Sequence, residues 1–117
     1  MDTTTLIDAY GEPARARRDT LIAGVFSAGG TLVDPPLTGA GHAGISDMAE
    51  AVQSQFAGHR FRRTSGVDEH HGFARYGWEL VGPDGAVAVG GVDVAELDGE
   101  GRLRRVVGFF APLPDAA

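Results

Sequence analysis

The chain has 117 residues, of which 43% are hydrophobic and 22% charged, and its formal net charge is −6 at pH 7. A chain of this length forms one domain, so we expect a single domain over residues 1–117. The negative charge argues against nucleic acid as a partner, because phosphate binding needs a positive field. Since no run approaches the ~20 apolar residues of a membrane span and the first residues lack the basic start of a secretory signal, we expect a cytoplasmic protein with no membrane partner. Without cysteine there is neither a disulfide nor a thiol nucleophile.

The first half of the sequence predicts three helices. Residues 3–10 begin with threonines that can cap a helix, and a second helix begins near Pro13 and ends near residues 28–30. A third, with apolar residues spaced by three and four, covers residues 45–56 and stops at a glycine. Between the last two lie a short β run at residues 31–36 and a glycine-rich loop.

The second half of the sequence changes to the alternating pattern of strands. The turn signals that separate these strands are typical of an antiparallel meander. Helices that precede such a sheet indicate an α+β fold with the helices on one of its faces. The expected strands are residues 59–67, 72–81, 86–97 and 102–113, and the connecting turns are residues 68–71, 82–85 and 98–101.

One ionisable residue interrupts the third of these strands. It is Asp93, and the other side chains on its face of the strand are small or apolar. A carboxylate in such surroundings costs free energy unless it is paired, hydrogen-bonded or neutral. Asp93 is therefore either an acid in a functional site or an ordinary salt-bridged residue.

The registers of the two hairpins decide what lies near Asp93. A two-residue loop within residues 98–101 places Val106 opposite Asp93, with Gly108 and Phe110 on the same side. The other hairpin is open to two registers. A two-residue loop puts the aromatic residues of residues 74–80 on the side of Asp93, whereas a three-residue loop puts Arg75 opposite it.

We favour the two-residue loop, because it groups the aromatic residues and leaves Arg75 beside Glu79 on the wetter face. Asp34 is a second acid of interest, since it precedes a proline and must be extended. The alternative is that it only shapes the turn. His70 and His71 are consecutive and point to opposite faces of a strand, so they cannot both bind one metal ion.

Three segments together resemble the nuclear-transport-factor-2-like superfamily. They are Val25–Pro35, the entry into a helix at residues 39–45, and Val92-Asp93 followed by residues 97–103. Nearly the whole chain, Leu6 to Pro114, is covered. The superfamily includes ketosteroid isomerases, SnoaL-like polyketide cyclases, limonene-epoxide hydrolases and scytalone dehydratases.

The resemblance implies a cone-shaped fold. Three N-terminal helices would pack on a strongly curved antiparallel sheet, a cystatin-like α+β barrel, with a deep apolar pocket between helices and sheet. A homodimer through the outer face of the sheet is also implied.

The resemblance also implies roles for three residues. The ketosteroid isomerases hold an Asp base, a Tyr and a neutral Asp that donates to an oxyanion. Asp34 is similar to the base, Asp93 to the neutral acid and Tyr10 to the tyrosine. If the link between the first two helices is longer than in the isomerases, Leu6 takes the place of Tyr10. Limonene-epoxide hydrolase chemistry is disfavoured, because Gly91 stands where that branch has an arginine.

The sequence therefore predicts a small-molecule pocket protein with metal-free general acid-base chemistry, isomerase-like or cyclase-like, on an apolar carbonyl compound. We expect no metal and no other cofactor. The alternative is a non-catalytic ligand-binding or dimerisation module whose Asp93 is ion-paired. The residues expected to line the pocket are Phe26, Met48, Val52, Phe56, Tyr76, Trp78, Val106, Phe110 and His71, beside the candidate catalytic residues Asp34, Asp93 and Tyr10.

Overall fold

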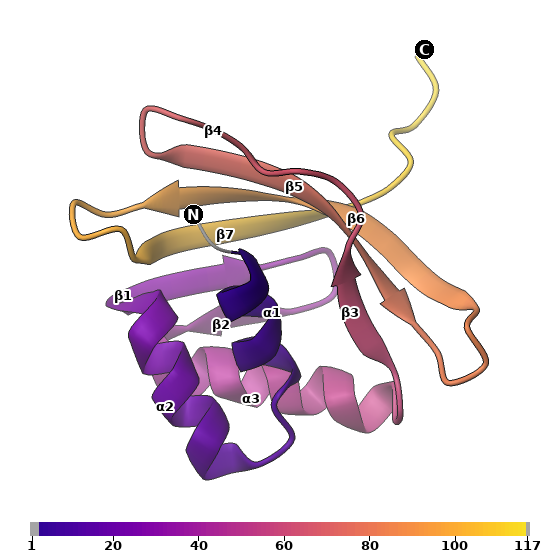
Figure 1. Ribbon diagram of the computed structural model, residues 1–117, viewed down its shortest axis with the longest axis horizontal. Coiled ribbons are helices and arrows are strands. Elements are labelled where there is room, and N and C mark those ends of the chain that lie inside the picture. Colours follow the sequence, from indigo (N-terminus) through magenta and orange to yellow (C-terminus); the bar gives the residue numbers. More distant parts are fainter. Residues whose placement is uncertain (1–2, 117) are drawn as a thin grey trace.

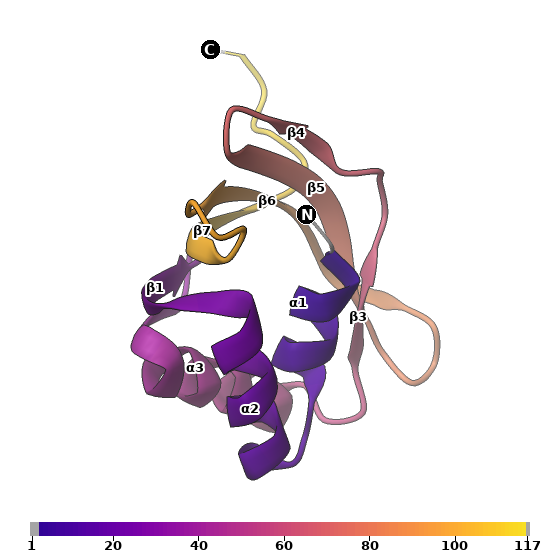
Figure 2. The same cartoon turned by 60° about the vertical axis from the view of Figure 1, so that its left-hand side comes forward.

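Three helices pack against one face of a mixed sheet in the computed structural model, which describes residues 3–116 (Figures 1 and 2). This arrangement confirms the expected α+β class. The helices are α1 (Thr3–Gly11), α2 (Arg15–Val25) and α3 (Gly41–Gln55). The strands are β1 (Phe26–Val33), β2 (Thr38–Ala40), β3 (Arg60–Arg63), β4 (Asp68–His70), β5 (Phe73–Val81), β6 (Val87–Leu97) and β7 (Leu103–Phe110).

The sheet is open and not wholly antiparallel, which corrects the expected strongly curved antiparallel barrel. Its strand order is β2-β1-β7-β6-β5-β3, with β4 also paired to β5. β1 and β7 run parallel, and every other pair is antiparallel. No short turn joins β1 to β7, so no hairpin fixes their relative direction. Within the described residues the edge strands β2 and β3 do not pair with each other, so the sheet does not close.

Three segments differ from the predicted secondary structure. α2 ends at Val25, and residues 26–30 begin β1 instead of extending the helix. The glycines of this segment are poor helix formers. Phe26 pairs with Leu103, and the Ser27 hydroxyl donates to the Leu103 carbonyl at 3.1 Å, so contacts with β7 decide its conformation. Residues 38–40 and 68–70, expected to be loop and turn, form β2 and β4 by pairing with β1 and β5.

Both long hairpins contain three-residue loops that end in a glycine with positive φ, +85° at Gly85 and +80° at Gly101. The predicted two-residue loops are therefore wrong. Each hairpin also has a register shift close to its loop. Relative to the predicted register, the three-residue loop moves the pairing by one residue, and the irregularity near the loop moves it by one more. Because strand side chains alternate with a period of two, the predicted faces survive, although Asp93 lies opposite Gly108 and not Val106.

A buried arginine, Arg18, joins α2 to α3. The Arg18 side chain is only 1% exposed. Its Nε donates to Ser46 Oγ on α3 at 2.9 Å, and its Nη1 donates to the Glu12 carbonyl oxygen at 2.9 Å. Its Nη2 makes no hydrogen bond to a described residue, and it lies 3.7 Å from the Glu50 carboxylate, which balances the buried charge. Arg18 thus fixes α2 against α3 and holds the link that follows α1.

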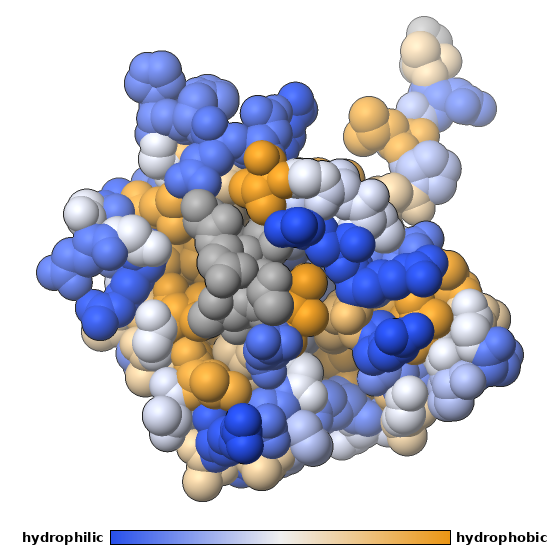
Figure 3. All heavy atoms as spheres, in the orientation of Figure 1, coloured by the Kyte–Doolittle hydropathy of each residue, from blue (hydrophilic) through white to orange (hydrophobic). Residues whose placement is uncertain are grey.

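Hydrophilic side chains cover most of the face that Figure 3 shows, with smaller hydrophobic patches near its centre. Among the helices of residues 3–116, none is long and apolar enough to cross a membrane.

Replacing Arg18 tests this contact directly. We expect Arg18→Ala to lower the free energy of unfolding by about 2–4 kcal/mol, because it removes two hydrogen bonds and leaves a cavity where a large buried side chain had packed. The matched control is Arg17→Ala, whose side chain is 74% exposed, with a change within about 0.5 kcal/mol. Urea denaturation measures both, and equal losses for the two variants would contradict the assigned role.

Candidate functional site

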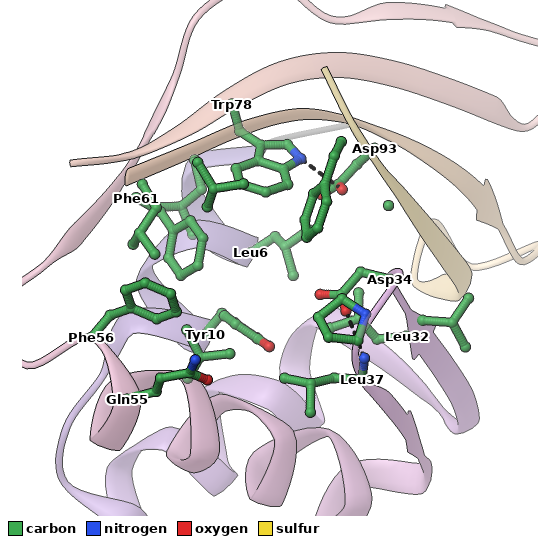
Figure 4. Close-up of a pocket in the computed structure, with 18 of the residues that line it drawn as sticks. Leu6, Tyr10, Leu32, Asp34, Leu37, Gln55, Phe56, Phe61, Trp78 and Asp93 are labelled. Carbon is green, nitrogen blue, oxygen red and sulfur yellow. Dashed lines mark hydrogen bonds between the residues drawn. The ribbon is translucent and has the colours of Figure 1, made fainter. Parts of the chain in front are cut away.

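A pocket of about 310 Å³ lies between α1, α3 and the concave face of the sheet (Figure 4). Its walls are mostly aliphatic and aromatic, and the charged side chains among the described lining residues are two carboxyl groups, Asp34 and Asp93. The lining residues are Leu6, Ile7, Tyr10, Leu32, Val33, Asp34, Pro36, Leu37, Val52, Gln55, Phe56, Phe61, Tyr76, Trp78, Leu80, Val89, Asp93, Gly108 and Phe110.

The two acids belong to one row of residues that crosses four adjacent strands. Asp93 on β6 lies opposite Gly108 on β7 and opposite Tyr76 on β5. On the other side of Gly108, the parallel pairing of Val33 with Val107 brings the next residue of the chain, Asp34, beside it. The row therefore reads Asp34, Gly108, Asp93 and Tyr76, and we call it the carboxyl row.

Asp93 accepts two hydrogen bonds from β5. The Tyr76 hydroxyl donates to Oδ2 at 2.8 Å, and the Trp78 Nε1–H donates to Oδ1 at 2.9 Å. Bonds from two neighbouring aromatic residues fix the orientation of the carboxyl group. These bonds place Asp93 on the pocket wall, as Figure 4 shows.

The structure excludes the register in which Asp93 pairs with an arginine. Arg75 and Glu79 lie opposite Val94 and Gly90 of β6 and not opposite Asp93. Arg75 is bonded to Asp68 at 2.8 Å, and Glu79 to Arg62 at 2.6 Å. The ion-paired alternative for Asp93 is therefore wrong.

A glycine makes room for the tryptophan that bonds to Asp93. Gly91 lies directly opposite Trp78, and a Cβ added there would come within 2.5 Å of Trp78 Cζ2 and would also collide with the Phe109 carbonyl. Real Cβ atoms do not approach so closely, so any larger residue at 91 would displace the indole. Gly91, which the sequence offered as evidence against an epoxide hydrolase, also has this packing role.

Burial governs the electrostatics of the site. It raises the pKa of Asp93 to about 6, the bonds from Tyr76 and Trp78 oppose this rise, and the charge of Asp34 adds to it. Burial also raises the pKa of Asp34, against the hydrogen bond from the Leu37 amide. The pKa of Tyr10 is raised by burial and by both carboxylates, so its hydroxyl stays protonated. Both acids thus ionise closer to neutral pH than an exposed Asp does.

Asp34 shapes a turn and also faces the pocket. The Leu37 N–H donates to its Oδ1 at 2.9 Å, while the Asp34 N–H donates to the Leu37 carbonyl at 2.9 Å. This turn contains Pro35 and Pro36, which restrict its backbone. Its other oxygen, Oδ2, makes no hydrogen bond to a described residue, and the side chain is half-buried. Asp34 can therefore shape the turn and also act as an acid in the pocket.

Tyr10 and Leu6 both reach the pocket from α1, one turn of helix apart. The Tyr10 ring meets the edge of Phe61, with ring centroids 5.6 Å apart. Its hydroxyl has no hydrogen-bond partner among the described residues, which leaves a donor in the pocket for a ligand.

Five of the residues predicted to line the pocket do so: Val52, Phe56, Tyr76, Trp78 and Phe110. Phe26, Met48 and Val106 do not: they are buried in the same hydrophobic core, but at positions that do not border the pocket. His71 is exposed at the turn between β4 and β5, far along the sheet from the carboxyl row. No group of three His, Asp or Glu side chains within residues 3–116 could hold a metal ion.

Sequence reasoning did not assign several residues to the pocket wall. Phe61 alternates with arginines on an edge strand, which is a readable signal for one inward-facing side chain. The residues of the turn after β1 carry no such pattern, since their place depends on how β1 docks on β7. The missed residues are Leu6, Ile7, Leu32, Val33, Pro36, Leu37, Gln55, Phe61, Leu80, Val89 and Gly108.

Comparison with solved structures places this geometry in a family. A protein of the SnoaL-like family from Agrobacterium tumefaciens str. C58, provisionally named an isomerase, is 37% identical to this chain over 94% of each chain, with a TM-score of 0.89. The chain belongs to the SnoaL-like family. No protein-family model matches the sequence, and no curated protein does either.

More distant structures share the fold of this SnoaL-like protein. A protein with a ketosteroid isomerase-like fold from Catenulispora acidiphila, in complex with trimethylamine, is 16% identical over 93% of this chain and 84% of its own, with a TM-score of 0.75. A provisionally named SnoaL-like polyketide cyclase from Jannaschia sp. CCS1 is 13% identical over 92% of this chain and 83% of its own, with a TM-score of 0.70. At these identities the likeness concerns the fold alone.

The raised pKa of Asp93 makes a prediction about stability. The folded state holds a proton on Asp93 up to about pH 6, and an unperturbed Asp up to about pH 3.8. The protonated form therefore stabilises the fold below pH 3.8, and this contribution is lost as the pH rises to about 6. We expect it to amount to about 3 kcal/mol.

The variant Asp93→Asn cannot titrate, while its amide still bonds to Trp78 and Tyr76. Its stability relative to the wild type should increase by most of that amount, about 2 kcal/mol, between pH 4 and pH 7, measured by urea denaturation at each pH. Asp68→Asn, at an exposed acid, is the control. Parallel pH profiles for wild type and Asp93→Asn would contradict the burial of a titrating carboxyl.

Proposed function

We propose that the pocket binds an apolar carbonyl compound and moves a proton at the carbon next to the carbonyl, as in an isomerase or a polyketide cyclase. The observation that carries this proposal is that two carboxyl groups lie on either side of Gly108 in a mostly apolar pocket. Carboxyls in such surroundings have a pKa closer to neutrality, which suits general acid-base catalysis. The proposed chemistry needs neither a metal nor another cofactor.

Asp34 is the proposed base. It is half-buried, so it remains partly hydrated and ionises more readily than Asp93, and its Oδ2 is free to accept a proton. Removal of a proton from the carbon moves the electron pair onto the carbonyl oxygen and gives an enolate. The Tyr10 hydroxyl, which makes no hydrogen bond to a described residue, donates one to that oxygen.

Asp93 is the proposed acid. Burial, and to a lesser extent an ionised Asp34, raise the pKa of Asp93 to about 6, so below that pH Asp93 holds a proton. A bound apolar ligand removes water and raises this pKa further, which favours the neutral form that donates to the enolate. Asp34 then returns the proton to the ligand, at the same carbon or at a conjugated one. Both acids thereby regain the protonation states in which they started.

The comparisons support this proposal at the level of the family. Proteins of similar structure carry provisional names as isomerases and polyketide cyclases, and one binds a small organic molecule, trimethylamine. The ligand of the present protein is proposed from the chemistry of its own pocket.

Hydrogen exchange at carbon tests the reaction without the natural substrate. We expect the protein to accelerate exchange of the α-hydrogens of 2-tetralone in D₂O, followed by ¹H NMR. Asp34→Asn should slow the catalysed exchange by about 10²–10⁴-fold, because it removes the base. Asp115→Asn, at an exposed C-terminal acid, should have no effect. The absence of exchange above the buffer rate would refute the proposal.

A second candidate is a pocket that binds such a compound without transforming it. The observation in its favour is that Tyr76 and Trp78 already occupy both oxygens of Asp93. Ligand-induced thermal stabilisation by 2-tetralone without exchange would support it.

We also propose a homodimer through the outer face of the sheet. Val92 lies opposite Phe109, and Val94 opposite Val107, so four apolar side chains form a patch on β6 and β7 that we call the outer patch. Val92, Val94 and Phe109 are 38%, 39% and 55% exposed. Contiguous apolar surface of this kind commonly marks an interface.

A charge within the outer patch should prevent this association. We expect Val94→Glu to be a monomer and the wild type a dimer, as measured by sedimentation equilibrium. Leu113→Glu, which adds the same charge in the C-terminal segment, is the control and should remain dimeric. A monomeric wild type at micromolar concentration would contradict the dimer.

A further inference from the structure

The space above Gly108 is bounded by both acids of the carboxyl row. A Cβ built on Gly108 would lie 3.0 Å from Asp93 Oδ1 and 3.2 Å from Asp34 Cβ. Its next neighbour is the Val33 carbonyl oxygen at 3.6 Å. No described side chain fills this space, since residue 108 is a glycine that lines the pocket. We call it the Gly108 notch.

The Gly108 notch is slightly too small for a carbon atom at the Cβ position itself. A Cβ placed there makes contacts of 3.0 to 3.2 Å, which are tighter than ordinary van der Waals contacts but not impossible. A ligand carbon can enter the notch from the pocket without being bonded to the strand, so it can settle slightly farther out. There it lies between Asp93 Oδ1 and the Asp34 side chain, whose Cβ is the nearest atom.

The backbone conformation of residue 108 does not explain why it is a glycine. Its φ is not positive, unlike those of the turn glycines Gly85 and Gly101. An alanine could adopt the same backbone in a strand, and would avoid the flexibility that makes glycine unfavourable there. Glycine at 108 instead avoids the close contacts that a Cβ would make with Asp93 and Asp34, and it leaves the strand surface between them open to the pocket.

From these contacts we infer that the Gly108 notch is the seat of the reacting carbon, and that Gly108 determines specificity by admitting only an unbranched carbon there. This inference rests on the proposed proton transfer. It names the substrate class more closely: a carbonyl compound whose acidic carbon is a CH₂ group, or an unsubstituted CH of a conjugated system. A methyl branch on that carbon would meet the Asp93 carboxyl on one side or Asp34 on the other.

Two ketones that differ by one methyl group test the inference on the wild-type protein. The probes are 2-tetralone and 1-methyl-2-tetralone, and the readout is exchange at carbon 1 in D₂O, divided by the exchange rate in buffer alone. We expect the methyl group to lower this ratio by about 10- to 200-fold, the range for one misplaced methylene in a packed site. Equal ratios for the two ketones would overturn the inference.

A substitution tests the same space from the protein side. Gly108→Ala should lower the exchange of 2-tetralone by at least about tenfold, because its methyl group occupies the notch. The matched control is Gly90→Ala, also in a strand, where an added Cβ makes ordinary contacts of 3.6 and 3.7 Å. It should exchange 2-tetralone as fast as the wild type. Circular dichroism shows whether each variant is folded.

The outcomes separate this inference from the proposed function. If the wild type and Gly108→Ala exchange 2-tetralone equally well, the inference is wrong and the proton-transfer function stands. If the wild type exchanges neither ketone, the proposed function fails, and the inference fails with it. If Gly108→Ala does not fold, the comparison of the two ketones on the wild type decides alone.

Discussion

The pair of hydrogen bonds that Asp93 accepts from Tyr76 and Trp78 is the interaction on which the site depends. Without it, a carboxyl group in an apolar wall would be unsatisfied and free to rotate. With it, the acid is held in one orientation on the same face of the sheet as Asp34. The mixed sheet then completes the arrangement, because the parallel docking of β1 on β7 brings Asp34 into the carboxyl row. Two acids that are 59 positions apart in the sequence are thereby brought to either side of one glycine.

Much of this face was predictable from alternation alone. The pleat places Tyr76, Trp78, Gly108 and Phe110 on the side of Asp93 under any even change of register. Each hairpin departs from the predicted register by two residues, one from its loop and one from a second shift, so the faces were right although the opposing residue was not. A single insertion in either hairpin would have moved the aromatic residues to the opposite face.

Other features could not be read from the sequence, for physical reasons. The strand segment at residues 26–30 contains small residues and glycines, and its conformation comes from pairing with a distant strand. The parallel direction of β1 and β7 has no local signal, since some seventy residues separate them and no short turn connects them. Apolar spacing likewise cannot tell Met48, which is sealed in the core, from Val52, which borders the pocket one turn of helix further along. Gly108 was placed on the correct face, but only the contacts of its missing side chain reveal the notch.

The bond between Trp78 and Asp93 has a practical consequence. The sequence contains a single tryptophan, and its indole N–H is bonded to the acid whose ionisation matters most. Tryptophan fluorescence of this protein, excited selectively over the two tyrosines, therefore comes from one indole at the wall of the cavity, so its emission reports the charge and hydration of that wall. Ligand binding in the pocket can thus be followed by the fluorescence of the native protein, without a dye or label.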